Sequence, residues 1–343
     1  MGLQIKDILK HKTIKIDELS NKTVVIDSFN LIYQFLTTIR QPNGMLLTNS
    51  KGETTSHLIG LFSRTARLLE KGIKPVFVFD GKAPELKEKE RERRKEIKLK
   101  AERKYEIAKE REDITEMKKY ASRTARINDE IIKSSKELIS AFGLPIVQAA
   151  SEGEAQAAYM AKKDSSIYAV VSQDFDSLLY GAPRLIRNLS ITGRRKKANS
   201  LAYGNVEIEE YGLAENLNLL GIDIEQLIAL AVLIGTDYNR GGIKGIGPKK
   251  ALGLVKRFGK DFEGLFEYAG WKQSFEFPWT EVFYTIKKMK VNEDYALVFN
   301  DIDKKKIKEL LVEKYEFSEE RVESTLKKIK EKDKEQKGLG DFF

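Results

Sequence analysis

The chain has 343 residues, of which 41% are hydrophobic and 33% are charged, and its formal net charge is +9. It contains no cysteine, which excludes disulfides, zinc–thiolate sites and catalytic thiols. The apolar run 227–234 is too short to cross a bilayer, and the first residues lack a signal-peptide core, so we expect an intracellular protein that is cytoplasmic or nucleoid-associated, with no membrane partner.

Short strands alternate with helices in the first part of the chain. In chain order the patterns predict a strand at 23–27, helices at 28–36 and 55–72, and strands at 75–81, 143–149, 166–174 and 184–189. Gly72 closes the second helix. This alternation predicts an α/β fold with a mostly parallel twisted central sheet flanked by helices, in which ligands gather at the carboxyl ends of the strands.

Residues 86–112 interrupt this alternation with an unusually charged segment. It contains 12 Lys or Arg and 8 Glu, without Gly or Pro. The pattern indicates a helix, but it has almost no apolar stripe and cannot pack as a core helix. A solvated helical hairpin, or disorder, explains the composition, and from the missing apolar stripe we expect the segment to become ordered on binding. A charged arch that handles single-stranded nucleic acid explains it as well.

From about residue 222 onward the chain is predicted to be helical, with a glycine-rich break after residue 240. Gly245 and Gly247 allow tight turns, and Pro248 suits the first turn of the following helix. The free N–H groups of that helix, with Lys249 and Lys250 beside them, form a phosphate-binding arrangement that reads the DNA backbone and not the base sequence. A plain turn between two helices is the alternative.

Acidic residues fall where strands should end or helices should begin. They are Asp27, Asp80, Glu152, Glu154, Asp174, Asp176 and Asp237. Each has an ordinary explanation, such as a helix cap at Asp27 or a capping box formed by Ser151 and Glu154. Pooled in one crevice, however, the acids would repel each other unless cations neutralised them.

Hard oxygen ligands in a basic protein indicate Mg²⁺, with Mn²⁺ as a substitute, acting on a phosphodiester. Two such ions about 4 Å apart would hold the attacking and leaving oxygens. A phosphatase-type site would also use Asp and Mg²⁺. It normally has Asp-x-Asp directly after the first strand, whereas here Asp27 is followed by Ser-Phe.

Together these motifs resemble the flap endonucleases, structure-specific 5′ nucleases of DNA replication and repair, and specifically the archaeal form. The resemblance extends from about Gly2 to Phe343. Its most specific stretches are VVIDSFNLIYQF, TSHLIGLFSRTARLLEKGIKPVFVFDGKAPELK, SEGEAQAAYMA, SQDFDSLLYGAPRLIRNLSITG and GTDYNRGGIKGIGPKKAL.

The resemblance implies roles for individual residues. The seven acids would hold the metals, and Lys87 and Arg94 would reach the scissile phosphate from a helical arch over roughly 82–125 that passes the free 5′ strand. Tyr33 would stack on a base, and Arg40 and Arg64 would contact DNA. The segment 237–259 would be a helix–two-turn–helix element that grips the downstream duplex, with a bound K⁺.

The resemblance also implies a partner for the C-terminus. Residues 1–325 would form the nuclease domain, and 326–343 a flexible tail ending in Q-x-x-L-x-x-F-F. In this motif Gln336, Leu339, Phe342 and Phe343 would bind the replication sliding clamp. The alternative is that the two Phe residues fold back onto the protein's own core.

The expected activity is removal of 5′ flaps from branched DNA by a protein that is monomeric on its own. A sibling 5′ exonuclease, a bubble-cutting repair nuclease, and a non-catalytic junction-binding partner of the clamp are alternatives. Two features depart from the family pattern. Ala150 stands where relatives usually carry Pro, and within the arch only Lys87 and Arg94 match cleanly.

Overall fold

The structure is a computed structural model that describes residues 3–121, 123–189, 193–196 and 203–340. Its strands are β1 (Lys12–Ile14), β2 (Thr23–Asp27), β3 (Lys74–Phe79), β4 (Ile146–Gln148), β5 (Ile167–Val171), β6 (Arg184–Arg187), β7 (Gly193–Lys196), β8 (Tyr203–Val206) and β9 (Ile208–Gly212). Its α-helices are α1 (Ser28–Thr38), α2 (Ser56–Glu70), α3 (Glu88–Glu110), α4 (Ile114–Ala121), α5 (Asp129–Ala141), α6 (Gly153–Lys163), α7 (Asp176–Leu179), α8 (Leu213–Leu220), α9 (Ile224–Ile234), α10 (Pro248–Phe258), α11 (Phe262–Tyr268), α12 (Trp271–Ser274), α13 (Trp279–Lys287), α14 (Lys304–Lys308) and α15 (Glu319–Gly340).

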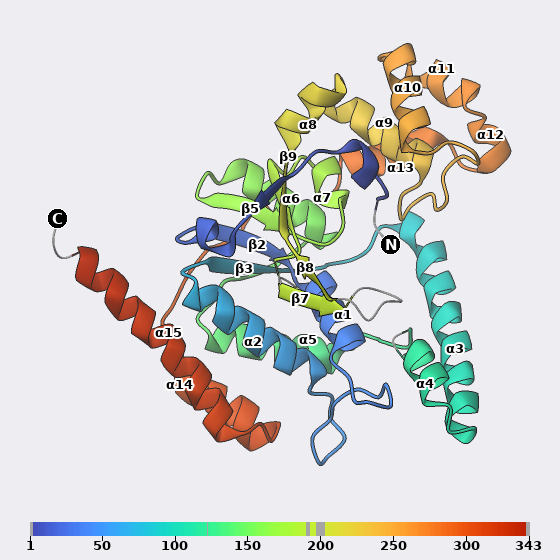
Figure 1. Cartoon of the computed structure of the whole chain (residues 1–343). Helices are drawn as coiled ribbons and strands as arrows, with labels where there is room; N and C mark the ends of the chain where they lie inside the picture. Colours follow the sequence, from blue (N-terminus) through green and yellow to red (C-terminus); the bar gives the residue numbers. More distant parts are fainter. Residues whose placement is uncertain (1–2, 122, 190–192, 197–202, 341–343) are drawn as a thin grey trace.

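A seven-stranded sheet with the order β1-β9-β6-β5-β2-β3-β4 forms the centre of the molecule (Figure 1). The five strands predicted from sequence, β2 to β6, pair in parallel. Strand β9 pairs antiparallel with β6 and with the edge strand β1, and neither β1 nor β9 was predicted. The mostly parallel sheet is therefore confirmed, with an antiparallel edge added.

The chain reverses its direction across the sheet between β2 and β5. It runs from β2 through β3 to β4 on one side, and then returns to place β5 against the other side of β2. In wound sheets such a reversal opens a crevice at the carboxyl ends of the two central strands. Asp27 ends β2 and Asp174 follows β5, so both lie at this crevice.

Alternating side chains of the central strands pack into two cores. Val24 and Ile26 face α1, α2, α5 and α15, whereas Val25 faces the alanine-rich α6. A third core holds the very apolar α9 together with α10 to α13 and residues near the N-terminus. These helices form a lobe beside the carboxyl ends of the strands (Figure 1).

The charged segment forms the long helix α3, which pairs with α4 in a helical hairpin that stands away from the sheet (Figure 1). Among the described residues, the buried apolar side chains of α3 are Ala101 and Ala108, and those of α4 are Met117 and Ala121. Small side chains thus replace the wide apolar stripe of a core helix, which explains how so charged a sequence still pairs. The helical part of the prediction is confirmed.

The C-terminal helix α15 continues past the predicted domain boundary at residue 325. Leu326 and Ile329 are buried in the core, so the first turn of the predicted tail belongs to the folded body. Gln336 and Leu339 lie in the last turns of α15, while Phe342 and Phe343 lie outside the described residues.

The helices of the described part of the chain are short or polar compared with a membrane span. No single helix there is long and apolar enough to cross a bilayer. Together, α8 and α9 are long and apolar enough to span a bilayer, but the chain bends by 79° between them. Most of α9 is also buried in the third core.

Candidate metal centre

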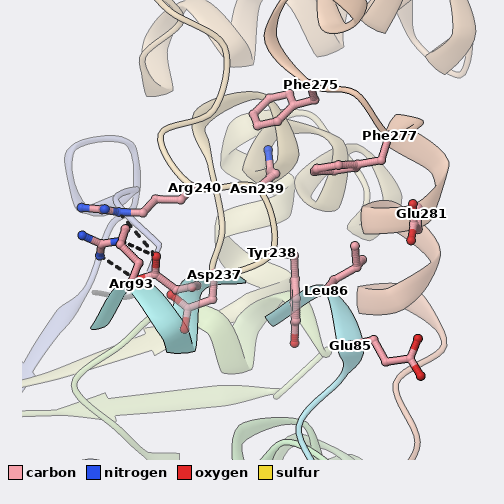
Figure 2. A pocket seen from close by; sticks show the side chains of 11 residues that line it. Glu85, Leu86, Arg93, Asp237, Tyr238, Asn239, Arg240, Phe275, Phe277 and Glu281 are labelled. Carbon is pink, nitrogen blue, oxygen red and sulfur yellow. Dashed lines mark hydrogen bonds and ion pairs between the residues drawn. The ribbon is translucent and has the colours of Figure 1, made fainter. Parts of the chain in front are cut away.

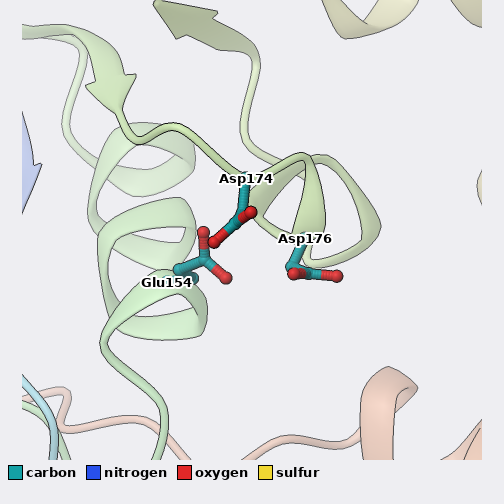
Figure 3. Close-up of side chains that lie close together, drawn as sticks. All are labelled: Glu154, Asp174 and Asp176. Carbon is teal, nitrogen blue, oxygen red and sulfur yellow. The ribbon is translucent and has the colours of Figure 1, made fainter. Parts of the chain in front are cut away.

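Three carboxylates meet at the carboxyl ends of the strands. Glu154 lies in the first turn of α6, Asp174 in the turn after β5, and Asp176 at the start of α7 (Figure 3). One carboxylate oxygen from each lies within 4.8 Å of the others, which is close enough to hold one metal ion. Sequence analysis predicted all three.

The other four acids surround this trio. Asp27 interacts electrostatically with Asp80 and Asp174. Asp80 interacts with Glu152, and Asp176 interacts with Asp237. The structure therefore brings the predicted acids into one connected cluster, although they come from five separate segments of the chain.

Burial and mutual repulsion raise the pKa values of several of these carboxyl groups. Burial, followed by repulsion from Asp80, raises the pKa of Asp27 to about 8. Burial and Glu152 raise the pKa of Asp80 to about 6, and burial and Asp174 raise the pKa of Asp176 to about 7. Burial also raises the pKa of Glu154 well above its usual range. Deprotonating all of these groups at neutral pH thus requires added positive charge.

This donor set fits hard divalent cations. It consists of carboxylate oxygens, which Mg²⁺ and Mn²⁺ prefer as ligands. A bound cation would also remove the repulsion between the carboxylates. The two histidines of the chain take no part. His57 is buried and bonded to Ser134 on another face, and burial lowers its pKa to about 4.

Ordinary structural roles explain only some of the acids. Asp27 does cap α1, because its side chain accepts a hydrogen bond from the Asn30 backbone N–H at 3.1 Å. Ser151 and Glu154 do not form the capping box that was the alternative. Ser151 donates to the Lys82 carbonyl instead, and Glu154 accepts from Ser172 Oγ at 2.8 Å.

Two cations from the base of the arch reach into the cluster. Lys87 Nζ lies 2.6 Å from a Glu152 oxygen and 3.4 Å from an Asp237 oxygen. Arg94 donates to Asp237 at 2.8 Å. Burial alone would lower the pKa of Lys87, but Glu152 and Asp237 raise it, so Lys87 stays charged. Both residues predicted to act on the phosphate thus lie beside the cluster of acids.

Glu90 connects the arch base to the loop after α9, a contact that sequence analysis missed. This buried carboxylate accepts from Arg93 and Arg94 at 2.8 Å and lies 3.9 Å from Arg240. Hydrogen bonds from Arg93 and then Arg94 lower its pKa to about 2. The sequence did not indicate that Glu90 is buried, because it is one of many Glu residues in a run of alternating charges.

A cavity of about 480 Å³ lies beside Asp237, on the side of Glu90 (Figure 2). Arg93 and Arg240 line one wall, and the rings of Phe275 and Phe277 line another. Three glutamates also line the cavity, so its charge does not favour a phosphate.

The glycine-rich loop joins α9 to α10 as predicted, with Pro248 at the first position of α10. Gly245 has a φ of +81°, as a tight turn requires. Gly247 has a φ of −94°, which any residue adopts. The requirement for glycine is stronger at Gly242, where φ is +57° and an added Cβ would lie 2.3 Å from the Ile234 backbone. Lys249 and Lys250 are exposed.

The remaining predicted DNA contacts come from α1, α2 and the chain between them. Tyr33 is exposed on α1, with Lys98 of the arch 5.6 Å from its ring centroid. Arg40 donates to the carbonyls of Leu36 and Gly44, so it also holds the following loop in place. Arg64 lies on α2 and lines a small hollow beside Leu189.

Comparison with known proteins gives consistent matches over nearly the whole chain. The XPG N-terminal domain model matches residues 1–101, and the XPG I-region model matches residues 143–237. All seven acids lie inside these two regions, and much of the arch lies between them. Flap endonuclease 1 of Thermococcus onnurineus is 50% identical over 335 residues, which are 96% of this chain and 95% of that protein.

Two solved structures also match the chain over nearly its whole length. Flap endonuclease-1 from Methanococcus jannaschii matches with a TM-score of 0.74 and 42% identity, covering 96% of this chain and 98% of that one. The catalytic core of Rad2 in complex with DNA substrate matches with a TM-score of 0.69 and 24% identity, covering 96% and 100%. The second match shows a shared fold.

Proposed function

Because the chain belongs to the flap endonuclease family of structure-specific 5′ nucleases, we propose that its seven acids form the metal centre that cuts 5′ flaps from branched DNA. The observation that carries this proposal is the convergence of Glu154, Asp174 and Asp176 at the crevice between β2 and β5. Hydrolysis there needs no Ser, Cys or His nucleophile.

Two divalent cations would be held by the seven acids, and when bound they would activate water and neutralise charge on the phosphate. Mg²⁺ is the expected ion, with Mn²⁺ as a substitute. The size of the acidic cluster supports two ions, because one cation would leave most of these buried carboxylates uncompensated.

Lys87 and Arg94 would stabilise the reacting phosphate. Both lie at the base of the arch and already contact the acids Glu152 and Asp237. A phosphate positioned against the carboxylates would therefore meet two cations from the opposite side. Such preorganised charge favours the transition state, in which the phosphate oxygens gain negative charge.

The single-stranded flap would pass along the inner side of the arch. A hollow of about 580 Å³ lies between α3 and residues 126–127. Its basic lining residues are Arg91, Arg94, Lys95, Lys98 and Arg126. Together with the exposed Tyr33 ring beside Lys98, this combination of cations and an aromatic ring suits a strand without sequence preference.

The duplex beyond the flap would bind at the start of α10. No side chain caps this helix, so its first N–H groups remain available for a phosphate, and Lys249 and Lys250 lie next to them. The tight loop before α10 is also where we propose a bound K⁺. A nuclease of replication and repair would work inside the cell beside the chromosome.

Cleavage by an Asp174→Ala variant tests the metal centre. We expect the variant to cut a labelled 5′-flap substrate on the order of 1,000-fold more slowly than the wild type, and to bind the junction almost as tightly. Asp294→Ala, at an exposed acid in the segment before α14, is the control and should cut normally. Normal turnover by Asp174→Ala would refute the assignment.

The same assay separates the alternative activities. A sibling 5′ exonuclease would degrade a plain duplex from its 5′ end, and a bubble-cutting enzyme would prefer an unpaired internal region. A non-catalytic junction-binding protein would cut none of these substrates with Mg²⁺ present. We expect the 5′ flap to be cut fastest.

The C-terminal motif is proposed to bind the sliding clamp. Deleting residues 336–343 should leave cleavage of free DNA unchanged and remove stimulation by the clamp, because the deletion keeps Leu326 and Ile329, the side chains by which α15 packs into the core. Lys337→Ala, which changes a position between the motif residues, serves as the control. Undiminished clamp binding by the truncated protein in a pull-down would contradict this proposal.

A further inference from the structure

Asn30 contacts two of the proposed metal-binding acids at once. It lies in the first turn of α1, three residues after Asp27. Its backbone N–H donates to Asp27 Oδ1 at 3.1 Å, and its side-chain Nδ2 donates to Asp174 Oδ2 at 2.9 Å. One half-buried residue therefore joins the ends of the neighbouring strands β2 and β5.

We propose that Asn30 is a positioning residue of the metal centre, whose amide holds Asp174 at a set place relative to Asp27. The inference rests on the proposed function of these acids. Without a restraint, the like charges of the two carboxylates would push them apart. A neutral donor counters this without competing for the site, whereas a Lys there would compete with the cation and an Asp would add repulsion.

A second neutral donor acts beside Asn30 in the same way. Ser172 is buried, its hydroxyl donates to Glu154 Oε1 at 2.8 Å, and the hydroxyl oxygen accepts from the Asp174 backbone N–H at 3.2 Å. Asp174 is thus held from its side chain by Asn30 and from its backbone by Ser172. Donors that orient ligands in this way typically change metal affinity by about 10- to 100-fold when removed.

Calorimetric titration of the DNA-free protein with Mn²⁺ tests the inference. Asn30→Leu has nearly the same shape but lacks the amide, and should weaken Mn²⁺ binding by about 10- to 100-fold. Asn30→Gln keeps an amide donor and should recover part of the loss. In cleavage assays the half-saturating Mg²⁺ concentration of Asn30→Leu should rise by a similar factor, and saturating Mg²⁺ should restore most of the rate.

Asn218→Leu, at an exposed site on α8, is the matched control and should bind Mn²⁺ normally. Should Asn30→Leu fail to fold, as judged by unfolding in EDTA, Asn30→Ser replaces it in the same titration. Wild-type Mn²⁺ affinity in the folded variant, or a loss confined to DNA binding, would overturn the inference. If the wild-type protein binds Mn²⁺ but does not cut flaps, the proposed function fails while this inference stands.

Discussion

At the residue scale, the acids combine two tasks that compete in most proteins. Asp27 caps a helix and also lies in the acidic cluster, and Asp80 accepts from the Gly153 N–H at 2.6 Å at the start of α6. A carboxylate that caps a helix is already fixed in orientation. The structural explanation of such an acid and its functional one are therefore compatible.

The raised pKa values make the metal-free protein sensitive to pH. Asp27 and Asp176 have pKa values of about 8 and about 7 when folded, against 3.8 ordinarily. Between about pH 4 and 8 the folded state binds protons that the unfolded state has lost, so raising the pH destabilises the folded state. In EDTA we expect the free energy of unfolding to fall by about 1 kcal/mol per pH unit between pH 6.5 and 8.

Denaturant unfolding in EDTA and in excess Mg²⁺ measures this effect. The slope should flatten with Mg²⁺, because bound cations keep the carboxylates deprotonated. The window begins at pH 6.5 because burial lowers the pKa of His57 to about 4. Below pH 6.5 this histidine makes the stability rise with pH, which opposes the effect of the carboxylates. A flat or rising curve in EDTA would contradict the expectation.

At the element scale, the arch is held together by few contacts. Its long helix α3 presents mainly charged residues, and its buried apolar side chains in the described part of the chain are Ala101 and Ala108. So few apolar contacts mean that the arch can open at a lower free energy than the sheet core. An element of this kind suits the passage of a single strand.

Met117→Asp should open the arch selectively. Met117 is 8% exposed on α4, and a buried carboxylate there should cost about 2–4 kcal/mol within the hairpin. We expect faster proteolysis within residues 88–121 and slower flap cleavage, while the cooperative unfolding of the rest of the protein changes little. Ile114→Asp, on the same helix at 56% exposure, is the control and should behave as the wild type. Global unfolding of Met117→Asp would show that the arch is not an independent element.

At the scale of the whole molecule, charge is distributed unevenly around the site. The net charge of +9 coexists with a cluster of seven acids at the strand ends. The net positive charge of the protein attracts DNA. The acidic crevice itself would repel the phosphate backbone unless cations neutralised it. Metal binding and DNA cleavage are therefore coupled through the electrostatics of the fold.

Removing both Lys249 and Lys250 should weaken duplex binding without changing sequence preference. The slope of log affinity against log salt concentration should become shallower by about 2, one for each lost phosphate contact. Lys327→Ala with Lys328→Ala, on α15 far from α10 (Figure 1), is the control for net charge. An equal change in both double variants would mean that binding depends on overall charge alone.

The sequence by itself determined the parallel strands, the helical character of the charged segment and the positions of the seven clustered acids, because strand and helix patterns are local and strand ends follow from them. Only the tertiary structure decided that Lys87 and Arg94 pair with Glu152 and Asp237, that Asn30 joins Asp27 to Asp174, and that Gly242 needs its small size. These contacts, like the antiparallel pairing of β1 with β9, connect residues far apart in the chain or depend on close backbone approach. The periodicity of a short stretch of sequence does not indicate which distant segments it will contact.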